Sequence, residues 1–415
     1  MLLLFLLAVS STFAEEPPSD LKAAVAGNNA FALDLYSMLK KEKGNLFFSP
    51  YSISSALAMT YGGARDDTAE EMAKVLHFAL GVDKTHPAFA ELNTVFGQIQ
   101  KRGQVQLHIA NSLWPQKGYR LLPEYLTLTK RYYGVSVTHV DYVKAAEDAC
   151  KIINTWVEDR TKDKIKNLIR PGALDPLTVL VLVNAIYFKG NWASQFDPNR
   201  TTESDFSLLG DAKTQVSMMY QKGKFGYGEI EGAQLLDLPY VGKELSMVLI
   251  LPEKPDGLSK VEDQLTTENL DSWVSRISEQ DVNVYLPKFK VTWGTFELNK
   301  PLQALGMRKA FGSGADFSGM DGTKTLFIGL VLHKACVEVN EEGTEAAAAT
   351  AVVMRKGLSR TYTFKADHPF LFLIRDNVTG SILFLGRILD PSNRIEIAQQ
   401  SPPLYREPAT RLPEK

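Results

Sequence analysis

The six histidines and two cysteines of this chain are its most reactive residue types, and their spacing favours neither catalysis nor metal binding. No two histidines lie at metal-ligand spacing, and there is no Cys-x-x-Cys pair. The chain also lacks Gly-x-Ser-x-Gly, His-Glu-x-x-His and a Walker-type phosphate loop. We expect no metal, no cofactor and no enzyme, although a hydrolase triad is defined by geometry and needs no local motif.

The segment 343–354 is the most informative part of the sequence, because it is made almost entirely of small residues and contains one charge, Glu345. Gly343, Thr344 and Thr350 disfavour a helix, despite the run of alanines. Side chains alternate across a strand, so Thr344 and Thr350 would face inward and Glu345 outward. The pattern predicts a segment that can exist both as an exposed loop and as a buried strand.

The residues that follow, 355–360, are polar and basic, which is typical of an exposed segment open to proteolysis. Residues 331–340, which precede the small-residue segment 343–354, alternate as in a strand. His333 shares one side of that strand with Val331 and Ala335. We therefore expect His333 to be a buried histidine satisfied by a hydrogen bond, and not a metal ligand.

Helical patterns crowd the first half of the chain and strand patterns the second. We expect a helix over about 145–169, and a capping box at Thr68-x-x-Glu71. Apolar runs at 179–188, 247–251, 282–286 and 369–385 predict strands, the last run forming a hairpin. This order, with no regular βαβ rhythm, favours an α+β fold in one large domain with mixed or antiparallel sheets.

The composition is that of a soluble globular protein of 415 residues with a net charge of −2. It offers no electrostatic basis for binding nucleic acid or a membrane, and Lys101-Arg102 is too little for a heparin site. Residues 1–14 resemble a secretory signal peptide, which predicts a secreted, extracellular protein, or a periplasmic or cell-surface one in a bacterium. The Pro-rich residues 391–415 are expected to form a flexible tail.

From about residue 21 to residue 390 the sequence resembles the serpin family. The resemblance rests on four motifs: the hinge-like segment 341–350, the segment 364–373, and the segments 184–192 and 45–52. It implies a serpin domain with three β-sheets, about nine helices and an exposed reactive-centre loop. It also implies a suicide mechanism, in which a serine protease forms a covalent acyl complex with the loop and the cut loop inserts into a sheet. A monomer with a risk of loop-sheet polymerisation is implied as well.

The resemblance also assigns roles to individual residues. The polar cluster beneath the sheet, the shutter, would comprise Ser49, Ser52, Asn184 and His333. The group at which the loop first enters the sheet, the breach, would comprise Trp192, Lys288 and Glu341. The hinge would comprise Gly343, Thr344, Glu345, Ala346, Ala347, Ala348, Ala349 and Thr350.

Counting from the hinge places Gly357 before the cut bond, whereas a loop shorter by one residue places Lys356 there. We prefer Lys356-Gly357, because the pocket of a trypsin-like protease needs a long cation. Leu358 would suit a chymotrypsin-like or elastase-like protease, and Arg355 and Arg360 remain alternatives.

The sequence thus predicts a secreted inhibitor of trypsin-like serine proteases. A non-inhibitory carrier or chaperone is the alternative. Cys150 and Cys336 are expected to stay unpaired.

Overall fold

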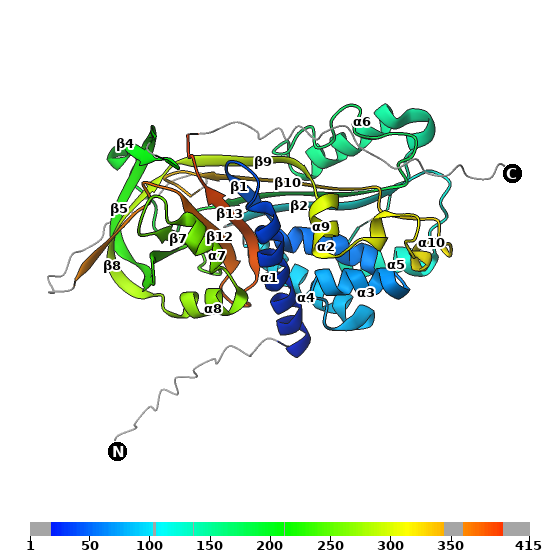
Figure 1. Ribbon diagram of the computed structural model, residues 1–415, viewed down its shortest axis with the longest axis horizontal. Helices are drawn as coiled ribbons and strands as arrows, with labels where there is room; N and C mark the ends of the chain where they lie inside the picture. Colours follow the sequence, from blue (N-terminus) through cyan, green and yellow to red (C-terminus); the bar gives the residue numbers. More distant parts are fainter. Residues whose placement is uncertain (1–17, 103–104, 136, 211, 344–359, 393–415) are drawn as a thin grey trace, which may run out of the picture.

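The computed structural model describes residues 18–102, 105–135, 137–210, 212–343 and 360–392 (Figure 1). These residues form ten α-helices and two short 3₁₀ helices. The proposed leader 1–14 and the tail beyond Ser392 lie outside them. No described helix is long and apolar enough to cross a membrane. The helices are α1 (Ser19–Leu39), α2 (Pro50–Tyr61), α3 (Asp66–Val75), α4 (Gly81–Lys101), α5 (Pro123–Tyr133), α6 (Tyr142–Arg160), α7 (Leu258–Asp263), α8 (Thr267–Ser275), α9 (Asn299–Leu305), α10 (Ser318–Asp321), η1 (Pro198–Arg200) and η2 (Lys309–Phe311).

A four-stranded sheet runs through the middle of the molecule in the order β2-β3-β10-β9. Its two central strands, β3 and β10, are parallel, and the outer strands pair antiparallel to them. Both central strands are almost wholly buried, as expected for strands covered on both faces. The strands are β2 (Val105–Pro115), β3 (Leu180–Gly190), β9 (Phe289–Glu297) and β10 (Leu330–Val339).

The remaining strands form a second, nine-stranded sheet in the order β1-β13-β12-β7-β6-β5-β8-β11, with β4 also paired to β5. The resemblance implied three sheets, but the 18-residue strand β5 pairs with β4 and β8 along one part and with β6 at its end, so two of them are hydrogen-bonded into one. The strands are β1 (Leu46–Phe48), β4 (Thr202–Ser207), β5 (Lys213–Ile230), β6 (Ala233–Pro239), β7 (Leu245–Pro252), β8 (Ser278–Pro287), β11 (Thr361–Lys365), β12 (Phe370–Asp376) and β13 (Ile382–Ile388).

Alternation along β10 divides the hydrophobic core into two layers. Ala335 and Val337 belong to the large core shared with α1 and α2, whereas Leu332 and Cys336 pack in a second cluster with Cys150 and Ile153 of α6. Helix α6 thus covers one face of the four-stranded sheet and α2 the other (Figure 1). Cys150 and Cys336 are both buried and free, as the sequence predicts.

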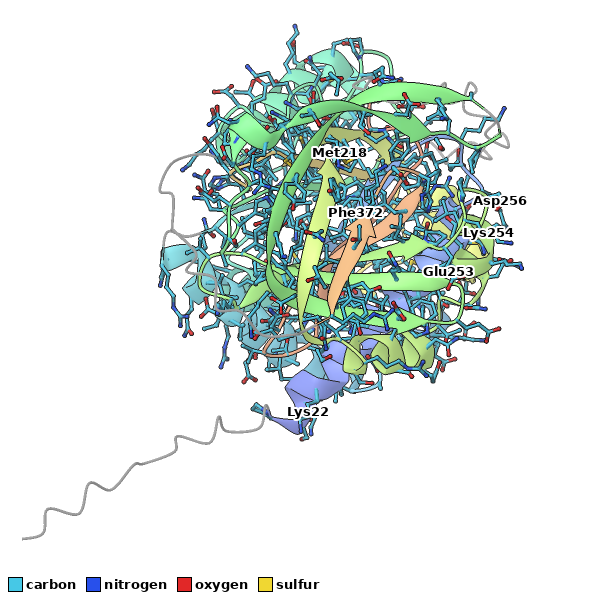
Figure 2. The ribbon with its side chains drawn as sticks, turned by 90° about the vertical axis from the view of Figure 1, so that its left-hand side faces the viewer. Lys22, Met218, Glu253, Lys254, Asp256 and Phe372 are labelled. Atoms are coloured by element: carbon cyan, nitrogen blue, oxygen red, sulfur yellow. The ribbon has the colours of Figure 1, made fainter. Side chains whose placement is uncertain are left out.

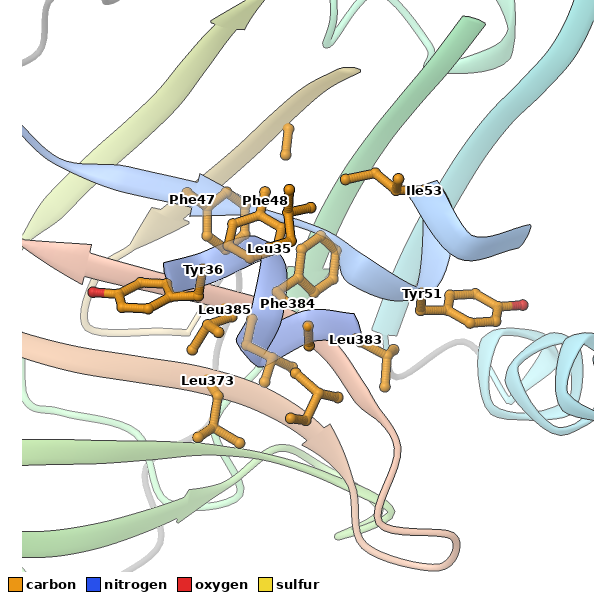
Figure 3. Packing of buried hydrophobic residues seen from close by; sticks show 14 of the residues in the cluster. Leu35, Tyr36, Phe47, Phe48, Tyr51, Ile53, Leu373, Leu383, Phe384 and Leu385 are labelled. Atoms are coloured by element: carbon orange, nitrogen blue, oxygen red, sulfur yellow. The ribbon is translucent and has the colours of Figure 1, made fainter. Parts of the chain in front are cut away.

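Aromatic rings fill the space between α1, α2 and the strands β1 and β13 (Figure 3). Phe47 stacks on Phe384 with ring centroids 5.0 Å apart, and on Phe372 at 5.7 Å. All three rings are fully buried, and each removes enough apolar surface from water to contribute roughly 2 to 3 kcal/mol. Viewed from the side, Phe372 and Met218 lie within strands, while Lys254 and Asp256 are at the surface (Figure 2). The stacked rings of Phe47, Phe372 and Phe384 hold β13 beneath the start of α2.

Two local expectations are wrong. The Thr68 hydroxyl accepts a hydrogen bond from the Asp316 N–H, and the Glu71 carboxylate accepts from the N–H groups of Arg308 and Lys309. Tertiary contacts therefore use both side chains, and α3 begins without a side-chain cap. Helix α6 ends at Arg160, and not near residue 169, because the chain turns through positive φ at Lys162, Asp163 and Asn167.

Candidate functional site

A row of polar side chains crosses the four-stranded sheet on the face that packs against α2. Asn111 of β2 lies opposite Asn184 of β3, and Asn184 lies opposite His333 of β10. Register partners in adjacent strands project to the same face, so the three side chains meet. Asn184 Nδ2 donates to Asn111 Oδ1, and Asn184 Oδ1 bonds to the His333 ring at Nδ1.

The start of α2 completes this cluster. Ser49 caps the helix by accepting a hydrogen bond from the Ser52 N–H at 3.2 Å, and its own hydroxyl donates to the Leu383 carbonyl of β13 at 2.6 Å. The Ser52 hydroxyl accepts from Asn184 Nδ2 and donates to Asn111 Oδ1 at 3.3 Å. Ser49, Ser52, Asn184 and His333, which the resemblance grouped together, are therefore linked by hydrogen bonds.

His333 is fully buried, and its hydrogen bonds define its protonation state. Its Nε2 accepts from the backbone N–H of Ser49 at 3.1 Å, so that nitrogen carries a lone pair. The proton is then on Nδ1, which donates to the Asn184 side chain. Burial also lowers the pKa of His333 to about 3. The ring is thus a neutral connector between α2 and the sheet, as expected for a satisfied buried histidine.

Beyond β10 the chain enters a tight turn that contacts the end of β3. Gly343 has a φ of +92°, and its N–H donates to the Asn340 carbonyl at 3.2 Å. A Cβ at this position would lie 2.4 Å from the Trp192 nitrogen and 2.5 Å from the Gly190 carbonyl oxygen. Position 343 therefore requires glycine on grounds of both backbone conformation and space.

Trp192 holds this turn from the β3 side. Its indole N–H donates to the Asn340 carbonyl at 3.0 Å, and its backbone N–H to the Glu342 carbonyl at 3.0 Å. The indole stacks on Tyr240 with centroids 4.7 Å apart. Trp192 is also 2% exposed, so it is a core aromatic as well as a partner of the turn.

Glu341 connects the turn to two further elements. Its carboxylate contacts Lys288 Nζ at 2.8 Å and accepts from the Thr201 hydroxyl at 2.8 Å. Burial raises the pKa of Glu341, but the hydrogen bonds from Lys288 and Thr201 outweigh that effect and leave it below its usual value. Trp192, Lys288 and Glu341 thus surround the end of the seam between β3 and β10.

Of the remaining predicted site residues, Arg360 alone belongs to the described part of the chain. Thr344 to Thr350 and Arg355 to Leu358 lie outside the described residues. Arg360 is described: it is exposed, and its guanidinium lies 4.8 Å from the Tyr362 ring centroid on β11.

Sequence reasoning missed Asn111, Thr201 and Tyr240. Asn111 interrupts an apolar strand pattern, which is a detectable signal, but only the strand register places it beside Asn184. Nothing local marks Thr201 or Tyr240, because both depend on a contact with a residue more than 45 positions away.

The arrangement at this site is a hydrogen-bonded seam between two parallel strands with a turn at its end. The turn at Gly343 leaves the sheet where the parallel strands β3 and β10 end side by side. A segment folding back from this turn would run antiparallel to both strands. To enter, it would have to separate the pairs from Leu330–Val181 to Cys336–Tyr187, including the His333–Asn184 contact at their centre.

Comparison with known proteins agrees with this architecture. A family model described as serpin (serine protease inhibitor) matches residues 26–391. The chain is 47% identical to the human leukocyte elastase inhibitor over 379 residues, which are 88% of this chain and 99% of that protein. The structure of Serpin48 from the insect Tenebrio molitor matches with a TM-score of 0.80 and 35% identity, covering 90% of this chain and all of Serpin48. Human thyroxine-binding globulin in complex with thyroxine matches with a TM-score of 0.81 and 31% identity, covering 90% of this chain and all of that one.

The chain therefore belongs to the serpin family, and the predicted α+β serpin fold is confirmed. It is a serine protease inhibitor by family and not an enzyme.

Proposed function

We propose that this chain inhibits a serine protease as a suicide substrate, by inserting its cleaved loop between β3 and β10. The observation that carries the proposal is the position of Gly343, a turn at the shared end of two parallel strands, directly before a segment of small residues. Small side chains allow a strand to enter a packed sheet, and a barrier to entry makes the native fold kinetically stable. The inhibitor acts as a monomer, with polymerisation by loop insertion between molecules as a liability.

The polar row and the turn at Gly343 have distinct roles in this mechanism. Ser49, Ser52, Asn184 and His333 act as the shutter that holds β3 and β10 closed at their middle. Trp192, Lys288 and Glu341 act as the breach, where insertion begins. Both places contain hydrogen bonds that join β3 or Trp192 to β10 or its turn, and these would have to break before a new strand could enter.

The target we propose is a trypsin-like protease that attacks the Lys356-Gly357 bond and forms an acyl-enzyme on Lys356. Arg360 is less suited to this role, because its guanidinium stacks on Tyr362 and β11 begins at the next residue. A reactive side chain has to fit the protease pocket, so it must extend away from the inhibitor. Gly357-Leu358 and Arg355 remain the alternatives.

An elastase-like target is the second candidate, favoured by the 47% identity to a protein named leukocyte elastase inhibitor. Its reactive bond would follow Leu358 or another apolar side chain of the loop. We rank it second because residues 355–360 are predominantly basic and polar.

We also propose that the protein is exported, with residues 1–14 removed as a signal peptide. What supports this proposal is the uncharged, apolar run 2–9, followed by the small residues Thr12 and Ala14 three and one before the cut. N-terminal sequencing of protein secreted from cells expressing the full chain tests this. Export predicts a new N-terminus near Glu15, and protein retained with Met1 would contradict it.

The test of inhibition is incubation of the full chain with trypsin and, separately, with leukocyte elastase. Trypsin is expected to form a denaturant-resistant complex at the summed mass, and mass spectrometry of the released C-terminal fragment identifies the cut bond. A complex with elastase alone would reassign the target. Cleavage without any complex would make the protein a substrate, as in the carrier alternative.

A pair of variants tests the direction in which the loop inserts. Thr344→Arg places a charge on the side expected to face inward, so insertion slows and the acyl-enzyme hydrolyses first. Glu345→Arg changes the opposite side and is the matched control. The proposal predicts that Thr344→Arg is cleaved as a substrate while Glu345→Arg still inhibits; the same behaviour in both would refute the assigned facing.

A further inference from the structure

A hollow of about 250 Å³ opens between α4, β2, the start of α2 and the C-terminal end of α6. Tyr51 and Phe96 form its apolar wall, with rings that meet edge to face at 4.6 Å between centroids. Leu107 and Ile109 of β2 extend this wall. Small-molecule sites typically combine such apolar walls with a few polar groups.

Gly97 lies in the lining of this hollow and has no packing reason to be glycine. It sits inside α4, where glycine costs roughly 0.5 to 1 kcal/mol relative to alanine. A Cβ at position 97 would meet no atom within 4 Å, and the φ of Gly97 is not positive. Any larger side chain at position 97 would project into the space that the glycine leaves open.

Polar residues line the hollow as well, with His108 on the face of β2 opposite to Leu107 and Ile109. The Nε2 atom of His108 is buried, and no described residue hydrogen-bonds to it. The Oδ1 atom of Asn93 already accepts from the Tyr51 hydroxyl, which leaves the Nδ2 donors of Asn93 for another partner. Gln100 adds a second amide at the edge.

The charge of the hollow is positive. Arg160 lines it, and none of the nine lining residues is acidic. Burial, together with the charges of Lys162 and Lys164, lowers the pKa of His108. The site therefore offers the Arg160 guanidinium and amide donors to an anion, and aromatic rings to an apolar body.

We propose that this hollow binds a small aromatic carboxylate, with its ring against Phe96 and Tyr51 and its carboxylate toward Arg160 and Asn93. The guanidinium can meet a carboxylate with two parallel hydrogen bonds, which a neutral amide cannot reproduce. None of its lining residues belongs to the polar row or the hinge, although Tyr51 stands between Ser49 and Ser52 at the start of α2.

The test is calorimetric titration of the full chain with 2-naphthoate and, for comparison, with the uncharged 2-naphthamide. We expect one site for naphthoate with a dissociation constant below about 1 mM, and binding of naphthamide at least about tenfold weaker. Equal affinity for the two compounds, or no binding of naphthoate, would overturn the proposal.

Three variants locate the site. Gly97→Leu fills the hollow with a better helix former and should abolish binding, with circular dichroism verifying that the fold is retained. Arg160→Gln should weaken naphthoate at least about tenfold and leave naphthamide unchanged. The Arg160 guanidinium lies over the Trp156 ring, 5.6 Å from its centroid. Arg131→Gln is the matched control, because Arg131 lies over the Tyr132 ring in the same way but belongs to α5. Undiminished binding by Gly97→Leu, or an equal loss in Arg131→Gln, would refute the location.

Discussion

Asn184 and His333 lie opposite each other on β3 and β10, and their side chains hydrogen-bond across the seam between these parallel strands. This is the seam that an inserted loop would have to open. The same Asn184 side chain also contacts Ser52 and Asn111, so one residue connects both central strands, the edge strand β2 and helix α2. Opening the seam therefore breaks a network and not a single bond.

Replacing Asn184 with alanine is expected to lower the free energy of unfolding by about 2 to 4 kcal/mol, because several buried polar groups lose their partner at once. Asn269→Ala is the control: Asn269 is exposed, and its side-chain amide donates to the Gln264 carbonyl at 2.7 Å. Urea unfolding measures both. Equal losses in the two variants would show that the row contributes no more than a surface hydrogen bond.

Acid is expected to destabilise the native fold through His333. Its pKa is lowered from 6.5 to about 3, so between these values the unfolded chain binds the proton and the folded chain does not. The stability that depends on the neutral ring is complete above pH 6.5, falls as the pH drops, and is lost near pH 3. At pH 5 the loss is about 2 kcal/mol, because each pKa unit corresponds to about 1.4 kcal/mol.

His333→Gln measures this contribution, since glutamine does not titrate. Burial also lowers the pKa of His86, to about 4, so His86 destabilises the fold in the same range of pH. The difference between the wild type and His333→Gln isolates His333. The variant should lose about 2 kcal/mol less than the wild type between pH 7 and pH 5. Parallel pH profiles would contradict the neutral, buried assignment.

Gly343→Ala is expected to displace the turn from the end of β3. The added Cβ would contact the Trp192 nitrogen and the Gly190 carbonyl, and the positive φ adds strain. The fluorescence of Trp192 should change, because the indole loses its fixed position between Asn340 and Tyr240. Gly312→Ala is the control, since a Cβ there meets nothing within 4 Å. A spectrum identical to the wild type would mean that the turn does not require glycine.

The ion pair between Lys288 and Glu341 should be only moderately stabilising. Its side chains are 41% and 10% exposed, so solvent screens the lysine but hardly the carboxylate. A double-mutant cycle with Lys288→Met and Glu341→Gln should give a coupling of about 0.5 to 1 kcal/mol. The pair Lys224–Glu279, 68% exposed on both sides, should give less. A larger coupling for Lys224–Glu279 than for Lys288–Glu341 would contradict the expectation that burial of the Glu341 carboxylate strengthens its ion pair.

Much of the fold could be predicted from periodicity and composition. The alternation over 331–340 correctly placed His333 and Ala335 on one face of a strand and Cys336 on the other. The apolar run at 179–188 correspondingly became β3. These predictions succeeded because side-chain alternation is a local property of the backbone.

Contacts between distant segments were much harder to predict. Thr68 and Glu71 have the spacing of a capping box, but folding supplies better partners near residues 308–316. Nothing in the spacing of residues reveals that Asn111 aligns with Asn184, because strand register is set by the whole sheet. The grouping of Ser49 with His333 came from the family resemblance alone, and their contact confirms only that they meet.

The most direct test of the account compares thermal unfolding before and after cleavage within residues 355–358. A native fold held by a kinetic barrier, with a loop able to become a strand between β3 and β10, predicts that the cleaved protein unfolds at a much higher temperature than the intact one. Unfolding curves that coincide would mean that no strand was inserted, and would contradict the proposed mechanism.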